Sequence, residues 1–156
     1  MAKRYTMGEV ARIAEEVERN GYAFYSRFAE SARDPQLREL CRELAHAEGE
    51  HQATFAAIFT NEPDEEAEAF PGDGEALIRS IVREYVFTQA DEKEFEALSL
   101  ASTDEFIDFA IGKERAAIEL FEGIRAQLSR RASRLVGEII EQERDHVRML
   151  KSVRSM

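Results

Sequence analysis

The chain repeats a Glu-x-x-His motif at an interval of 95 residues, and a separate glutamate precedes each copy by 29 or 30 residues. The six residues of this doubled pattern are Glu18, Glu48, His51, Glu114, Glu143 and His146. Residues three apart on an α-helix share a face, so each motif can direct its carboxylate and its imidazole at one metal ion. Four glutamates and two histidines are the ligand set of a dinuclear metal site inside a four-helix bundle.

The residues around this pattern are apolar at helical spacing. Leu44 and Phe55 lie one turn before and one turn after the first motif, and Ile139 and Leu150 flank the second motif in the same way. The six polar residues therefore occupy positions that the hydrophobic period assigns to a buried helix face. Burying an ionised carboxylate costs on the order of several kcal/mol, and facing carboxylates repel one another. No lysine or arginine lies on these stripes, so we expect two divalent cations to compensate the charge.

The composition of the chain argues against several other classes of function. It has 156 residues and a formal net charge of −11, which disfavours nucleic acid or an anionic membrane as a partner. No run approaches the roughly 18 apolar residues of a transmembrane helix, and the first seven residues lack the apolar core of a signal peptide. A cytoplasmic location is therefore expected. The single cysteine, Cys41, excludes a disulfide framework within the chain and a CxxC metal site.

Apolar residues recur with a helical period along nearly the whole chain, which predicts a single all-α domain over residues 1–156. The helix start signals are Thr6-x-x-Glu9, Asp34-Pro35 and Ser102-x-x-Glu105. The pattern predicts a helical hairpin over about 7–60, a crossover over about 61–102 and a second hairpin over about 103–153. Within the crossover, prolines and glycines indicate a loop at 61–74, and a short helix is predicted to follow over roughly 75–88.

The segments around the six residues resemble the rubrerythrin branch of the ferritin-like superfamily. The resemblance is carried by residues 18–25, 44–51, 114–121 and 138–146, and it extends over nearly the whole chain. It implies a ferritin-like four-helix bundle of two antiparallel hairpins joined by a long crossover. It also implies that the six residues bind two iron ions, with Glu18 and Glu114 as the carboxylates from partner helices, and that the protein forms a homodimer.

The same resemblance implies a redox function. Members of the family oxidise a di-ferrous centre with peroxide or dioxygen, and full-length rubrerythrins receive electrons from an attached four-cysteine rubredoxin domain. With one cysteine, this chain would need an external electron donor such as a rubredoxin-like protein. Ile111 stands one turn before Glu114, where the family tends to carry an additional glutamate, and this departure weakens a peroxidase assignment specifically. Tyr25, two turns from Glu18, is expected to be either a hydrogen-bonding or redox-active neighbour of the metals or a simple core tyrosine.

The sequence leaves three functions open. The leading hypothesis is a di-iron oxidoreductase that reduces peroxide or dioxygen. The second is iron oxidation for storage or detoxification, without turnover by a reductant. The third is a non-catalytic helical interaction module that contains a structural metal. Mixed carboxylate and imidazole sites accept iron, manganese and zinc alike, so the ligand types do not decide the metal.

Overall fold

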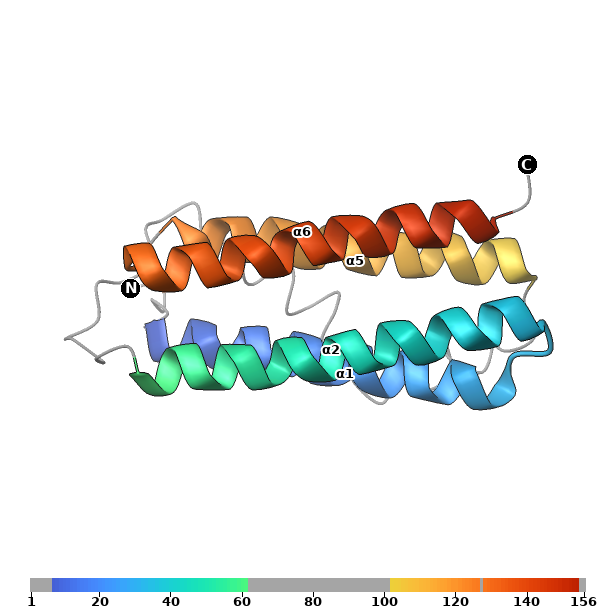
Figure 1. The fold of residues 1–156 in the computed structure, drawn as a ribbon, viewed down its shortest axis with the longest axis horizontal. Helices are drawn as coiled ribbons and strands as arrows, with labels where there is room; N and C mark the ends of the chain where they lie inside the picture. Colours follow the sequence, from blue (N-terminus) through green and yellow to red (C-terminus); the bar gives the residue numbers. More distant parts are fainter. Residues whose placement is uncertain (1–6, 62–101, 127, 155–156) are drawn as a thin grey trace, which may run out of the picture.

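The computed structural model of the protein describes residues 7–61, 102–126 and 128–154. Within these ranges the chain forms the helices α1 (Met7–Ser31), α2 (Pro35–Asn61), α5 (Thr103–Arg125) and α6 (Arg130–Val153). Helices α1 and α2 form one antiparallel hairpin, α5 and α6 form another, and the two hairpins pack side by side (Figure 1). The predicted all-α, four-helix architecture is confirmed. The helix predicted over 75–88 lies outside the described residues.

The two hairpins contact each other through antiparallel neighbours. Helix α2 packs against α6, and α1 packs against α5. The C-terminal end of α2 lies at one end of the bundle, and α5 begins at the other end, so these two helices run in the same direction (Figure 1). This is the topology in which a long crossover joins two hairpins, and the crossover predicted over about 61–102 lies almost entirely outside the described residues.

Local capping contacts explain where three of the helices begin. The carboxylate of Asp34, the residue before the start of α2 at Pro35, accepts a hydrogen bond from the backbone N–H of Gln36 at 2.9 Å. Ser102 accepts one from the N–H of Glu105 at 3.2 Å before α5, and Ser129 caps α6 in the same way. The boundaries predicted at Asp34-Pro35 and Ser102 are thus confirmed, because these side chains satisfy helix N–H groups that lack an intrahelical partner. The signal at Thr6 lies outside the described residues.

The core consists of two apolar clusters with a polar layer between them. One cluster is built around Phe55 and Phe121, whose ring centroids are 4.8 Å apart. The other is built around Phe24, Phe28 and Phe106. The polar layer consists of the six residues Glu18, Glu48, His51, Glu114, Glu143 and His146, which lie between the two clusters along every helix.

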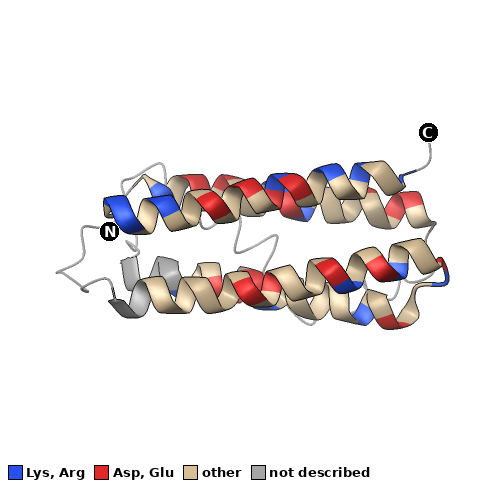
Figure 2. Cartoon of the chain, in the orientation of Figure 1, with Lys and Arg blue, Asp and Glu red and all other residues tan. Residues whose placement is uncertain are grey.

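Charged residues otherwise occupy the outside of the bundle. Figure 2 shows acidic and basic residues distributed along the described helices. Surface ion pairs join neighbouring helices, as where Arg154 at the end of α6 contacts Asp108 of α5 at 2.7 Å. No helix in the described ranges is both long enough and apolar enough to cross a membrane.

Candidate metal centre

The structure brings all six predicted residues together in the interior of the bundle. Each is at most 6% exposed, and the side chains of Glu18 and Glu143 are completely buried. Every described helix contributes, since α1 and α5 each supply one glutamate and α2 and α6 each supply a Glu-x-x-His pair. The buried positions that the hydrophobic period assigned to these polar residues are therefore the positions they occupy.

The side chains form two overlapping groups of potential ligands. The first group, called position 1 here, consists of Glu18, Glu48, His51 and Glu143, and the second, called position 2, consists of Glu48, Glu114, Glu143 and His146. In each group the ligand atoms all lie within 4.8 Å of one another. Glu48 and Glu143 belong to both groups, so their carboxylates could contribute to both positions.

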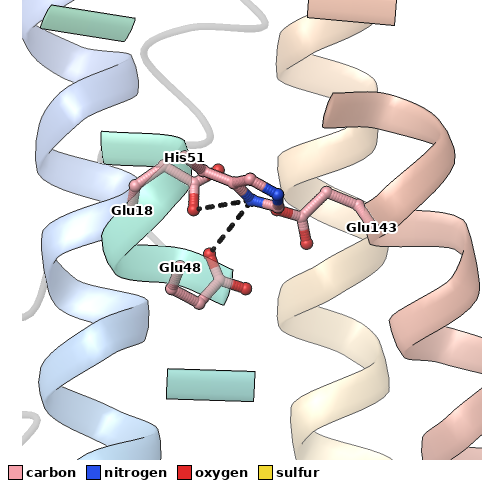
Figure 3. A group of neighbouring side chains, drawn as sticks. All are labelled: Glu18, Glu48, His51 and Glu143. Atoms are coloured by element: carbon pink, nitrogen blue, oxygen red, sulfur yellow. Dashed lines mark hydrogen bonds and ion pairs between the residues drawn. The ribbon is translucent and has the colours of Figure 1, made fainter. Parts of the chain in front are cut away.

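Both histidines turn the same ring nitrogen toward the carboxylates. The Nδ1 atom of His51 is 2.7 Å from Oε1 of Glu143 and 3.5 Å from Oε2 of Glu18. Figure 3 shows the side chains of position 1 converging from three helices on one point. On the other side, Nδ1 of His146 is 3.2 Å from Oε2 of Glu143 and 3.6 Å from Oε1 of Glu114. Each Nδ1 therefore lies where it could complete one metal position.

Glu18 provides the most direct test of whether cations fit this layer. It is fully buried, and neither of its carboxylate oxygens has a hydrogen-bond partner. Such a group is costly to bury, because burial removes water from the carboxylate and no hydrogen bond within the protein replaces that water. A divalent cation beside the oxygens would compensate both the lost hydration and the repulsion from the other carboxylates. The residues present thus fit a dinuclear metal centre.

Two carboxylates of the layer, Glu18 and Glu143, and both of its imidazoles favour protonation. Burial raises the pKa of Glu18 well above its ordinary value, and the charges of Glu48 and Glu143 raise it further. Burial also raises the pKa of Glu143, with repulsion from Glu114 as the next cause. Burial lowers the pKa of His146, but hydrogen bonds with Glu114 and Glu143 outweigh that effect and raise it to about 12. Metal ions would displace these protons, so metal affinity is expected to increase with pH.

Two further residues hold the ligands from outside the layer. The hydroxyl of Tyr25 donates a hydrogen bond to Oε1 of Glu114 at 2.7 Å, and Tyr25 is only 2% exposed. Tyr25 was one of the predicted neighbours of the metals. Gln142, whose Oε1 is 2.5 Å from Nε2 of His51, was not predicted. Gln142 falls off the apolar stripe, so helical periodicity gave no reason to single it out. Its position directly before Glu143 was the available signal.

Gly21 makes room for one of the shared carboxylates. It lies in α1, one turn after Glu18, where glycine weakens a helix. A Cβ atom added at Gly21 would lie 3.2 Å from both Cδ and Oε2 of Glu48. The missing side chain therefore allows the carboxylate of Glu48 to lie directly against the backbone of α1.

Replacing Gly21 with alanine is expected to weaken metal binding at both positions, because the new methyl group would displace Glu48. Gly112→Ala is a matched control, since a Cβ added at Gly112 in α5 meets nothing within 4 Å. The control should raise the free energy of unfolding by about 1 kcal/mol through helix propensity and leave metal affinity unchanged. Calorimetric titration with Fe(II) under anaerobic conditions measures the metal affinity of both variants, and urea unfolding measures the free energy of unfolding. Equal affinities in the two variants would contradict the role given to Gly21.

The comparisons with known proteins agree with this geometry. A family model described as Rubrerythrin matches residues 9–154. The chain belongs to the rubrerythrin family. The chain is also similar to a protein from Thermotoga maritima that is described as a candidate ferritin-like diiron-carboxylate protein. That match has a TM-score of 0.69 and 22% sequence identity, and it covers 97% of this chain and 96% of the other, so it supports the fold. No curated protein matches the chain.

Proposed function

We propose that the polar layer binds two iron ions and that this protein is a di-iron oxidoreductase, which reduces peroxide or dioxygen with electrons from an external donor. The observation that carries the proposal is the overlap of the two donor groups, which share Glu48 and Glu143 inside the bundle. Membership of the rubrerythrin family and the description of the Thermotoga maritima protein as diiron-carboxylate both support iron as the metal.

Under this proposal each part of the layer has a defined task. Glu18 and His51 would hold one ion, Glu114 and His146 would hold the other, and Glu48 and Glu143 could contribute to both. When bound, the pair of iron ions supplies the two electrons that reduce one molecule of peroxide to two molecules of water, with two protons. The phenylalanines on either side of the layer, including Phe55 and Phe24, exclude bulk water from it.

Tyr25 has a separate proposed role beside position 2. Its hydroxyl proton is held against Glu114, and burial together with the negative charge of Glu114 raises the pKa of Tyr25 well above its ordinary value. The phenol therefore stays protonated and fixes the orientation of that carboxylate. Because the phenol of Tyr25 is buried and bonded to the layer, we also propose that it takes part in electron transfer with the metals.

Tyr25→Phe tests that role, because it removes the hydroxyl and keeps the ring. Two metal ions should still bind, but oxidation of the reduced protein by peroxide should slow by about 10- to 100-fold, the usual effect of losing a partner of a metal ligand. Stopped-flow absorbance in a single turnover measures the rate. Tyr22→Phe is the matched control, since Tyr22 is 49% exposed. If both variants react at the wild-type rate, Tyr25 is only a core residue.

Iron oxidation for storage or detoxification is the second candidate, and one observation favours it. Ile111 lies one turn before Glu114, is 7% exposed and packs in the apolar cluster around Phe24. An apolar side chain there provides no additional carboxylate that could follow a change in metal charge. The layer would then oxidise iron but would lack the additional ligand that repeated reduction by a donor requires.

Anaerobic loading with Fe(II) followed by peroxide separates these functions. Repeated peroxide consumption with a chemical reductant supports the oxidoreductase, whereas stoichiometric oxidation followed by stalling supports iron storage. Protein from its native host that contains only zinc would instead indicate a structural metal.

The donor is proposed to be a separate rubredoxin-like protein, because the single cysteine of the chain, Cys41, is buried. The active form is proposed to be a cytoplasmic homodimer, which sedimentation analysis and fractionation would test.

A further inference from the structure

The two halves of the chain supply matching ligands but different supporting residues. An offset of 95 residues relates Glu48 to Glu143 and also Ala47 to Gln142. Gln142 contacts His51 across the hairpins, whereas the methyl group of Ala47 has no polar atom that could contact His146 in return. The ligand layer is therefore nearly symmetric, and the contacts that hold it are not.

A second difference lies on the glutamates. An offset of 96 residues relates Glu18 to Glu114 and Tyr25 to Phe121. Tyr25 donates a hydrogen bond to Glu114, but Phe121 cannot donate one, and both oxygens of Glu18 lack a hydrogen-bond partner. At position 1 the histidine thus has a hydrogen-bond partner outside the layer, and Glu18 has none. At position 2 it is the glutamate, Glu114, that has such a partner.

The contact at His51 has a specific chemical consequence. A neutral imidazole carries one proton on its two ring nitrogens, and a metal ion needs the nitrogen that lacks it. The carbonyl oxygen of Gln142 lies 2.5 Å from Nε2 of His51, where it accepts a hydrogen bond from an Nε2–H group. With one proton held at Nε2, a metal ion would take the place of the proton on Nδ1, which is the nitrogen directed at Glu143 and Glu18.

We propose that Gln142 is a positioning residue that holds His51 with Nε2 protonated and Nδ1 presented to the metal ion of position 1. This inference rests on the proposed dinuclear site and deepens it, because it makes the two metal positions unequal. Gln142 is on the exposed side of α6, so it acts through His51 and is not itself a ligand. Its loss should therefore affect position 1 and leave position 2 intact.

Titration of the full-length, metal-free protein with Co(II), followed by calorimetry and visible absorption, tests the proposal. The wild type should bind two equivalents. Gln142→Leu should bind one of them about 10- to 100-fold more weakly, as expected when the hydrogen-bond partner of a metal-bound histidine is lost. Glu141→Leu is the matched control, because Glu141 is the exposed neighbour that pairs with Arg144 instead of with the layer. Gln142→Glu keeps an acceptor oxygen and should restore the affinity.

A spectroscopic signature distinguishes positioning from a general structural effect. In the Zn(II)-loaded wild type with ¹⁵N-labelled histidine, the ring proton of His51 should appear on Nε2 and exchange slowly with water. In Gln142→Leu that proton should exchange faster, while the ring proton of His146 and the circular dichroism of the bundle stay unchanged. A His51 ring protonated on Nδ1 in the Zn(II)-loaded wild type would overturn the proposal.

The binding result also separates this inference from the proposed function. Two Co(II) equivalents with wild-type affinity in Gln142→Leu would overturn the role of Gln142 while leaving the dinuclear site in place. Equal weakening of both equivalents would overturn the assignment to position 1. A wild-type chain that binds no Co(II) would overturn the dinuclear site, and this inference with it.

Discussion

Replacing Glu143 with alanine is expected to abolish the binding of both metal ions, whereas replacing Glu18 with alanine should weaken only one. The reason is that Glu143 belongs to both donor groups and Glu18 belongs to position 1 alone. Both side chains are fully buried, so the two substitutions remove comparable groups from comparable surroundings. The difference in stoichiometry therefore reports the sharing of the carboxylate and not a general loss of packing.

The measurement is the metal content after anaerobic incubation with Fe(II) and gel filtration. We expect it to fall from two ions to none in Glu143→Ala and from two to one in Glu18→Ala. Loss of a direct ligand should weaken binding by more than about 100-fold, since the hydrogen-bond partners of ligands alone contribute 10- to 100-fold. Glu138→Ala, on the exposed face of α6, is the control and should retain both ions. One ion remaining in both Glu143→Ala and Glu18→Ala would refute the shared bridge.

Glu18→Met is expected to stabilise the metal-free protein, although it removes a metal ligand. A buried carboxylate without hydrogen bonds opposes folding, and replacing buried ionic groups by apolar residues of similar volume often stabilises by about 1–4 kcal/mol. Urea unfolding in the presence of a chelator measures the change in the free energy of unfolding. With metal present the order should reverse, because binding to the folded state stabilises the wild type more.

The advantage of Glu18→Met should also increase with pH. Burial raises the pKa of Glu18 above its ordinary value of 4.5, so the folded wild type binds a proton that the unfolded chain releases. Stability is fully present below the ordinary pKa and decreases as pH rises toward the raised value. Methionine has no such proton, so the difference between the two proteins should be smallest near pH 4.5 and larger near neutrality. A difference that is constant over this range would show that Glu18 ionises normally in the folded protein.

The helices and the residues of the polar layer could be predicted from the sequence because the relevant signals are local. The cap at Ser102 and the proline after Asp34 fix helix starts through contacts within three residues. Residues three or four apart share a helix face, so apolar neighbours alone assigned Glu48 and His51 to the interior. The same reasoning applied to every helix that contributes to the layer.

Only the tertiary structure decided which of those residues belong to both metal positions and which other residues contact them. That Glu48 and Glu143 are shared, that Gly21 accommodates a carboxylate, and that Gln142 holds His51 all depend on distances between different helices. Those distances are set by the rotation and height of one hairpin against the other, which side chains from both halves determine jointly. A helical period specifies which face of its own helix a residue occupies, but it carries no information on which atom of another helix that residue will meet.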